Sequence, residues 1–395
     1  MLTIDTTLSP QTLVNQVLMD QSSDLIIKNV RYSGKPYSIA AFENDLPEEL
    51  IDAGIILSSG NVFDALGPND AVNTGSRSSA RTDNDLQAIA TSVVTDAAVL
   101  EFDLIALRDS LEFTFIFASE EYPEYVNKGV NDVFGFFIKE EGSRALHPRN
   151  IALLPDGRTT VSIDNVNHRR NEEYFLPSDF LHVHSDDFWR EHPQMALRAK
   201  LFQFDGFTVP LKAKLKLREG KTYHLKIAIA DVGDRIYDSA VLIKAKSLSA
   251  KGKRIPQADK IVKEYVGEQL SKLESKYLSM GQDSLTFDLR IQFNTNESEI
   301  LPDSYSPLHD LASMMQNMKS LKLLIIGHTD NVGAAEENMI LSIERAKAVR
   351  SFLVQQNIST ERLSMAAKGE TAPLNQNNTE AERFENRRVE FHLSF

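Results

Sequence analysis

The sequence predicts a multidomain protein: an N-terminal all-β sandwich, jelly-roll-like, followed by a small C-terminal α/β sandwich. The chain has 395 residues, which is more than one hydrophobic core usually serves. Residues 24–244 contain about ten apolar or alternating runs separated by turn residues, with little helix between them, as is typical of a β sandwich. After residue 285, runs of strand length alternate with apolar stripes at helical spacing, which predicts an α/β arrangement.

The composition excludes several classes of protein. Forty-three basic residues against 56 acidic ones give a net charge of −13, which argues against a nucleic-acid surface or an anchor on an anionic membrane. The hydrophobic fraction of 42% and charged fraction of 25% are those of a globular protein. The absence of cysteine excludes disulfides, thiolate metal sites and cysteine nucleophiles, and leaves the compartment open.

The sequence predicts neither a membrane span nor a signal peptide. No apolar run approaches the roughly 18 residues of a transmembrane helix. Residues 1–20 are polar and lack a basic stretch followed by an apolar one. We therefore expect either that the chain begins after a cleavage site or that the protein leaves the cytoplasm by another route. The sequence does not distinguish between these two possibilities.

In the N-terminal domain, apolar positions at helical spacing over residues 10–19 predict a helix that begins at Pro10. A tract rich in Gly, Ser, Asn and Asp over residues 58–85 predicts a long loop. Alternation and apolar runs predict strands at residues 24–30, 37–42, 54–57, 97–104, 111–117, 133–138, 151–154, 159–163, 202–207, 211–217, 223–230 and 239–244.

The domain boundaries follow from a change in pattern near residue 250. Residues 246–254 are rich in Lys, Ser and Gly and precede Pro256, which predicts a linker, and a helical stripe begins at Ile261. We assign 1–250 to the β domain, 251–284 to the linker and connecting helix, and 285–395 to the C-terminal domain. Within the last domain the predicted order is strand 285–293, helix 308–318, strand 321–326, helix 336–356, strand 363–367 and strand 387–393.

The second of these helices carries polar residues on its buried face. At about 100° per residue, Arg345 and Asn338 fall within the same arc as its apolar residues. The preceding strand ends close to Asp330, so a carboxylate and a guanidinium can face each other as a clamp for an amino-acid head group. The alternative is that Asp330 and Arg345 neutralise each other as a structural ion pair.

Residues 285–395 resemble the OmpA-like domain of peptidoglycan-associated outer-membrane proteins. The motifs that carry the resemblance are Phe293-Asn294, Gly327-His328-Thr329-Asp330-Asn331, Leu341-Ser342 with Arg345-Ala346, Arg362-Leu363, Gly369 and Asn386-Arg387-Arg388-Val389-Glu390-Phe391. The resemblance implies a βαβαββ fold that binds the diaminopimelate residue of a peptidoglycan stem peptide without covalent chemistry. It differs at residues 382–385, where a glycine followed by Arg is common in the family.

The resemblance also implies roles for individual residues of this chain. Asp330 and Arg345 correspond to the family's ligand-binding aspartate and arginine. Thr329, Asn331 and Asn338 fall in the same loop and helix start, and Arg388 matches a position that supports the pocket.

Acidic and amide residues gather at strand ends of the N-terminal domain. Carboxylate and amide oxygens near glycine are the ligands that Ca²⁺ prefers, so we consider a calcium site as this domain's cofactor. Its candidate ligands are Glu120, Glu121, Asn131, Asp132, Asp231, Asp234 and Asp238. Two alternatives stay open, namely the capping of turns by Asp and Asn and a surface that binds a partner.

The same segments resemble the choice-of-anchor L domain over about residues 10–250. The motifs are residues 54–60, 95–102, 117–122, 132–136, 204–208 and 229–234. The resemblance implies a secreted or cell-surface β domain, found in many Bacteroidetes proteins, and implies no ligand. Residues 168–194 fit it poorly; their histidines, His182, His184 and His192, indicate a solvated loop rather than a zinc site.

No catalytic motif of the common hydrolase, nucleotide-binding or metalloprotease classes is present. A glycosidase pair at Glu120 and Glu121 is disfavoured, because neighbours on a strand point to opposite faces. We therefore expect a non-catalytic protein of the periplasm, cell envelope or cell surface that binds peptidoglycan and displays its β domain to an unknown protein or glycan for adhesion or assembly. The alternative is a wall-docking component of a secreted or contractile injection machine, within an exported particle.

Overall fold

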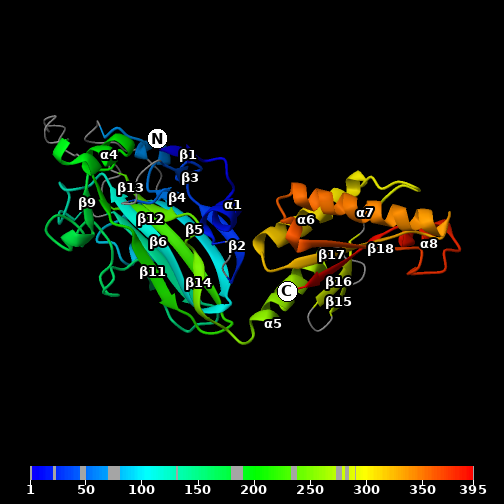
Figure 1. Ribbon diagram of the computed structural model, residues 1–395. Helices are drawn as coiled ribbons and strands as arrows, with labels where there is room; N and C mark the ends of the chain where they lie inside the picture. Colours follow the sequence, from blue (N-terminus) through cyan, green and yellow to red (C-terminus); the bar gives the residue numbers. More distant parts are fainter. Residues whose placement is uncertain are drawn as a thin grey trace. The chain divides into compact units, whose positions relative to one another are not determined.

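A computed structural model describes residues 2–20, 24–44, 50–69, 81–129, 132–178, 190–232, 238–272, 278–280, 284–289 and 291–394. The chain forms two compact units, Met1–Ile255 and Pro256–Phe395, and each is described by itself (Figure 1). Among the described helices, none is long and apolar enough to cross a membrane.

The first unit is a sandwich of two antiparallel sheets. The larger sheet has the strand order β1 (Thr3–Asp5), β3 (Ile39–Glu43), β4 (Ala53–Ser58), β13 (Ser239–Lys244), β6 (Arg108–Ser119), β10 (Gly206–Thr208) and β9 (Phe175–Pro177), and β11 (Leu211–Lys216) and β14 (Ser249–Arg254) also pair with β6. The smaller sheet has the order β2 (Leu25–Ser33), β5 (Val94–Ala106), β12 (Thr222–Val232), β7 (Val133–Glu140) and β8 (Arg149–Asn150). The predicted β sandwich is confirmed.

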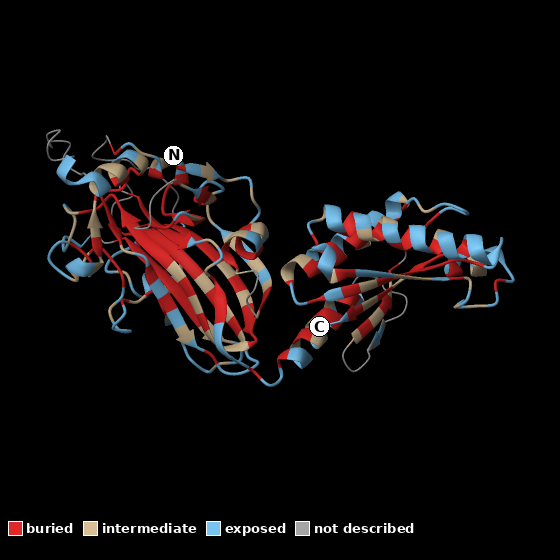
Figure 2. Ribbon diagram, viewed as in Figure 1, coloured by how far each residue is buried: buried red, intermediate tan, exposed pale blue. Residues whose placement is uncertain are grey.

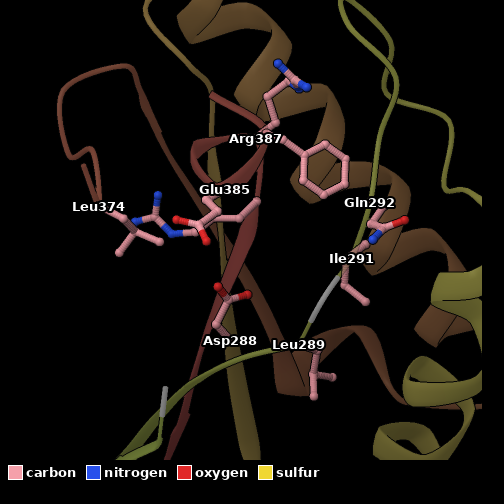
Figure 3. A pocket seen from close by; sticks show the side chains of 9 residues that line it. Asp288, Leu289, Ile291, Gln292, Leu374, Glu385 and Arg387 are labelled. Atoms are coloured by element: carbon pink, nitrogen blue, oxygen red, sulfur yellow. The ribbon is translucent and has the colours of Figure 1, made fainter. Parts of the chain in front are cut away.

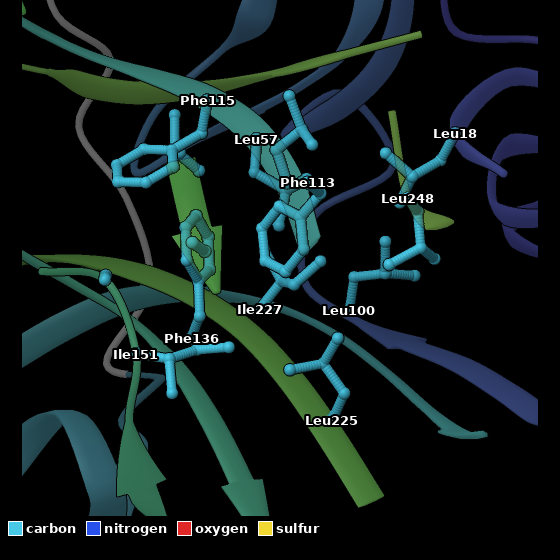
Figure 4. Packing of buried hydrophobic residues seen from close by; sticks show 14 of the residues in the cluster. Leu18, Leu57, Leu100, Phe113, Phe115, Phe136, Ile151, Leu225, Ile227 and Leu248 are labelled. Carbon is cyan, nitrogen blue, oxygen red and sulfur yellow. The ribbon is translucent and has the colours of Figure 1, made fainter. Parts of the chain in front are cut away.

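The core of this unit lies between the two sheets, where nearly every inward residue is buried (Figure 2). Phe113 and Phe115 of β6 meet Phe136 of β7 edge to face, with ring centroids 4.9 and 4.8 Å apart. Figure 4 shows these rings together with leucine and isoleucine side chains from the strands around them. The alternation seen in the sequence therefore places one face of each sheet in a shared aromatic core.

The outer face of the larger sheet carries a second apolar layer. Ile116 and Ala118 of β6 pack there with Phe207 and Leu242 from neighbouring strands and with Phe202. The short helical segments of this unit are α1 (Pro10–Thr12), η1 (Leu13–Leu18), η2 (Val62–Ala65), α2 (Asn84–Gln87), η3 (Glu172–Tyr174) and α4 (Pro193–Leu201). Both faces of β6 are thus buried near its C-terminal end.

Three predictions for this unit need correction. The predicted strands 151–154 and 159–163 make only an isolated bridge between Leu153 and Thr160, across a turn in which Asp156 accepts the Arg158 and Thr159 amides. The strand predicted at 202–207 is confined to β10. The residues assigned to a linker, 246–254, instead end in β14, where Ala250 pairs with Leu111.

The second unit is a five-stranded sheet with helices. The strand order is β15 (Leu278–Met280), β16 (Ser284–Asp288), β19 (Val389–Ser394), β17 (Lys322–His328) and β18 (Leu363–Gly369), with β17 and β18 parallel and the other pairs antiparallel. The helices are α5 (Ala258–Lys272), η4 (Pro302–Ser304), α6 (Tyr305–Asn317), α7 (Ala335–Gln355), η5 (Thr360–Arg362) and α8 (Glu380–Asn386).

The predicted βαβαββ order is confirmed from β16 onward, with α8 inserted before the last strand. The apolar run of β17 is buried because α7 packs against β17 and β18. The connecting helix predicted from Ile261 is α5, which contacts β15, β16 and α6 and so belongs to this unit.

Candidate binding site at the end of strand β17

Strand β17 delivers three consecutive polar residues into the protein interior. His328 and Thr329 are each 2% exposed and Asp330 is 5% exposed. They reach this depth because Gly327 lets β17 approach α7: a Cβ at that position would lie 1.9 Å from the carbonyl oxygen of Ser342. At the neighbouring strand end, Gly369 adopts a φ of +50° and accepts a hydrogen bond from the Thr329 amide. The ends of both parallel strands are therefore held against the first turns of α7.

Arg345 lies on the buried face of α7, where the helical period predicts it. Its side chain is 0% exposed, and its guanidinium donates to three backbone carbonyls. Nε binds Glu297 O at 3.0 Å, Nη1 binds His328 O at 3.2 Å and Nη2 binds Asn294 O at 3.2 Å. The guanidinium also lies over the Phe293 ring, with Cζ 5.0 Å from its centroid.

These contacts satisfy N–H groups without neutralising the charge. Burial lowers the pKa of Arg345 to about 10, and the charge of Arg387 acts in the same direction while Asp330 opposes it. A carbonyl oxygen carries no net charge, so the guanidinium keeps an uncompensated positive charge in a buried place. Three hydrogen bonds also use only three of its five N–H donors.

Asp330 pairs with Arg387 rather than with Arg345. Oδ2 lies 2.7 Å from Arg387 Nη1, and both side chains are less than 10% exposed. Oδ1 accepts the amide of Val332 at 3.1 Å. Asp330 and Arg345 therefore lie in one corner of the unit, as predicted, but neither the open clamp nor the mutual ion pair is formed. Each side chain has partners of its own.

Arg387 is the residue that sequence reasoning missed. Its Nη2 binds Glu380 Oε1 at 2.8 Å, and its guanidinium lies 5.5 Å from the centre of the Phe384 ring. Burial lowers the pKa of Arg387, but the hydrogen bonds that it donates to Asp330 and Glu380 outweigh burial, so its pKa is raised. Residues 382–385, which differ from the family pattern, form part of α8, and this helix supplies Glu380 and Phe384. The sequence feature that could have identified Arg387 is the pair Arg387-Arg388 directly before β19, whose two side chains have different partners.

The other predicted site residues surround this corner. Thr329 Oγ1 is buried without a hydrogen-bond partner in the described part of the chain, and Asn331 is exposed. Asn338 is 4% exposed and donates to Glu370 Oε2 at 2.6 Å. Arg388 donates to the carbonyl of Ala372 and lies 3.5 Å from Glu390, so it supports the segment beside the site.

A pocket of about 290 Å³ adjoins Arg387 (Figure 3). It combines apolar walls with two carboxylates and two guanidinium groups. Its lining residues are Asp288, Leu289, Ile291, Gln292, Leu374, Phe384, Glu385, Arg387 and Arg388. Neither Asp330 nor Arg345 lines it, so it is separate from the predicted clamp.

The predicted calcium ligands in the described part of the N-terminal unit are buried: Glu120 is 3% exposed, and Glu121 and Asp132 are each 0% exposed. Asp231 and Asp238 are likewise buried, whereas Asn131 and Asp234 lie outside the described residues. Burial and the charges of Asp205, Asp238 and Asp64 raise the pKa of Glu120 to about 10. Within the described ranges, no three His, Asp or Glu side chains converge closely enough to hold a metal ion as they stand.

The structure divides this predicted set into two parts. Glu121 accepts the Asp132 amide at 3.1 Å, and Asp132 accepts the Val232 amide at 3.1 Å. Burial, Glu121 and Asp231 raise the pKa of Asp132. Glu120 instead responds to Asp205 and Asp238, so the two consecutive glutamates, which follow the last residue of β6 in a turn, belong to different groups.

Comparisons with known proteins agree with this division of the chain. The model of a family described as the choice-of-anchor L domain matches residues 3–249, and that of the OmpA family matches residues 292–387. The chain is 35% identical over 103 residues to outer membrane porin F of Pseudomonas fluorescens, covering 26% of this chain and 32% of the porin. It is 31% identical over 100 residues to the peptidoglycan-binding protein ArfA of Mycobacterium tuberculosis, covering 25% of this chain and 31% of that protein.

These matches span about a third of each relative's length. Among solved structures, a putative MotB-like protein from Desulfovibrio vulgaris is 22% identical with a TM-score of 0.32, covering 35% of this chain and 91% of that protein.

Replacing Arg345 should destabilise the second unit. In Arg345→Ala, the carbonyls of Asn294, Glu297 and His328 lose their donor and a cavity opens, which should cost about 3–5 kcal/mol. Urea unfolding of the full chain would measure this loss. Lys347→Ala, an exposed change on the same helix, should stay within about 0.5 kcal/mol of the wild type; equal stability of the two variants would contradict the structural role.

His328 should make the second unit sensitive to acid. Burial and the Arg388 charge lower its pKa to about 4, below the value of about 6.5 in an unfolded chain. The neutral imidazole therefore contributes stability that is present above pH 6.5 and is lost as the pH falls towards 4. Between pH 7.5 and 4.5, the wild type should lose about 2 kcal/mol more than His328→Gln in urea unfolding. Parallel pH profiles would refute this.

Proposed function

Since the chain belongs to the choice-of-anchor L domain family and carries a segment matched by the OmpA family, we propose that it is a non-catalytic cell-envelope protein that binds peptidoglycan. The second unit binds the wall, and the first unit is displayed for adhesion or assembly. The matched segment includes Asp330, Arg345 and Arg387. One relative of similar sequence is named as a peptidoglycan-binding protein.

The observation that carries this proposal is the buried charge of Arg345. A guanidinium bonded to three carbonyls is a strong site for a carboxylate, because two parallel N–H groups match the two carboxylate oxygens. Diaminopimelate in a stem peptide offers a free carboxylate and a free ammonium on one carbon. Arg345 would take the carboxylate and Asp330 the ammonium.

Asp330 can accept the ammonium while keeping Arg387. Each of its oxygens makes one hydrogen bond, and an ionised carboxylate has about four acceptor positions in all. Arg387 and Glu380 then hold Asp330 in place, so their role is to position it rather than to contact the ligand.

The route to Arg345 passes through the turn formed by residues 294–297. This turn is exposed, and it contributes two of the three carbonyls on the guanidinium, those of Asn294 and Glu297. We expect the ligand carboxylate to replace these two oxygens when the turn moves aside. The carbonyl of His328 stays with Arg345, because β17 is fixed in the sheet.

Asp330→Asn should test the ammonium contact without removing the side chain. Loss of a charge-assisted hydrogen bond costs about 2–3 kcal/mol, which corresponds to roughly 30- to 150-fold weaker binding. The measurement is co-sedimentation of the full chain with purified peptidoglycan whose stem peptides contain diaminopimelate.

Two controls make this result specific. Glu344→Gln removes an exposed carboxylate on α7 that pairs with Lys347 and should retain the binding. Peptidoglycan with lysine in place of diaminopimelate lacks the second amino-acid centre and should bind weakly to the wild type. Unchanged binding by Asp330→Asn, or equal binding to both kinds of peptidoglycan, would contradict the proposal.

A further inference from the structure

The ends of three neighbouring strands in the larger sheet bring three carboxylates into one row. Ser119 of β6 pairs with Ser239 of β13 and with Gly206 of β10. The next residue on each strand is acidic, so the register places Glu120 beside Asp238 on one side and beside Asp205 on the other. The Glu120 amide donates to the Asp238 carbonyl at 3.2 Å, which confirms that the first pair stays together beyond the strands.

The row continues onto β9. Pro177 pairs with Gly206, and the Ser178 amide donates to the Asp205 carbonyl at 2.9 Å. Ala118, Ala240, Phe207 and Leu176 of the same strands share the outer apolar layer, and side chains two residues apart share a face. We call Asp238, Glu120, Asp205 and Ser178 the Glu120 row.

This row is buried and holds polar atoms that nothing satisfies. Glu120 is 3% exposed, and neither of its carboxylate oxygens has a hydrogen-bond partner among the described residues. The Ser178 hydroxyl, at 0% exposure, has none either. Like charges directly opposite each other on adjacent strands destabilise a sheet, and a buried carboxylate without a partner costs several kcal/mol. A bound cation would remove both penalties.

The neighbours of the row hold two of its carboxylates in place. The Asp238 carboxylate occupies the volume that a side chain at residue 60 would fill: a Cβ on Gly60 would lie 1.9 Å from Asp238 Oδ2. Asn69 donates to Asp205 Oδ1 at 2.8 Å and so orients that carboxylate. The charges that act on Glu120 come from Asp205, Asp238 and Asp64, which are all negative.

We propose that the Glu120 row binds one divalent cation, Ca²⁺, with Glu120, Asp205 and Asp238 as its charged ligands. All donors are oxygens, which favours Ca²⁺ or Mg²⁺ over zinc. Ca²⁺ accepts an irregular set of six to eight oxygens from carboxylates, hydroxyls, carbonyls and water, whereas Mg²⁺ demands a near-ideal octahedron. A row spread over several strands fits the first requirement.

Binding requires the carboxylates to turn towards one another, because the described side chains do not converge on one point as they stand. A cation placed between them would attract all three carboxylates. Glu121, Asp132 and Asp231 form a separate group: Glu121 accepts the Asp132 amide, Asp132 accepts the Val232 amide, and the charge of Asp231 acts on Asp132. Of the calcium ligands predicted from the sequence, the proposed site therefore uses Glu120 and Asp238, and it adds Asp205 and Ser178.

The test uses the full chain after chelation and dialysis. Isothermal titration with CaCl₂ should show saturable binding, and thermal melting should shift to higher temperature with CaCl₂ and back with chelator, because the ion binds the folded state alone. MgCl₂ at the same concentration should produce a smaller shift. Absence of both calcium heat and calcium-dependent melting in the wild type would overturn the proposal.

Variants locate the ion. Glu120→Gln keeps the shape of the side chain and removes its charge, so it should bind Ca²⁺ at least tenfold more weakly while melting at or above the temperature of the calcium-free wild type. Ser178→Ala removes one neutral oxygen, so it should also weaken Ca²⁺ binding, but by less than Glu120→Gln does. The control is Glu112→Gln on the same strand, whose carboxylate pairs with Lys214 at 3.8 Å and should not affect affinity. Wild-type affinity in Glu120→Gln would show that the ion binds elsewhere.

Discussion

The buried positive charge of Arg345 is the constraint on which the second unit depends. Its guanidinium joins three segments that are distant in sequence: the turn at residues 294–297, the end of β17 and helix α7. In this corner, Gly327 and the short side chain of Ser342 allow β17 and α7 to approach each other closely. A hydrophobic residue would pack here at lower electrostatic cost, and this cost is the reason why we propose a binding role for the charge.

The sequence predicted which residues lie in this corner better than it predicted which of them form ion pairs. Helical periodicity placed Arg345 and Asn338 on the buried face of α7, because the core face repeats every 3.6 residues whatever the tertiary contacts are. It did not predict that Asp330 binds Arg387. That choice depends on which of the two adjacent arginines before β19 faces Asp330, and on α8, a helix of seven residues that brings Glu380 and Phe384 to Arg387.

Similar reasons explain what was missed in the first unit. Residues 249–254 were predicted as part of a linker because they are rich in Lys, Ser and Gly. They form β14 by pairing with β6, and the sequence alone does not show that β6 offers an edge for this pairing. Asp205 and Ser178 were not recognised beside Glu120, because cross-strand neighbours are set by register and no local pattern encodes it. Each unit thus contains a buried ionisable group without an ion-pair partner of its own among the described residues: Arg345, held among carbonyls, in one and Glu120, beside other carboxyls, in the other.

The most direct test of the central claim follows the Arg345 Nε–H resonance by NMR during titration with a muropeptide that contains diaminopimelate. If the guanidinium exchanges the Asn294 and Glu297 carbonyls for the ligand carboxylate, this resonance should shift and saturate together with the amides of residues 294–297. A muropeptide whose free diaminopimelate carboxylate is amidated should cause little change. Saturable binding that leaves the Arg345 resonance unmoved would contradict the account.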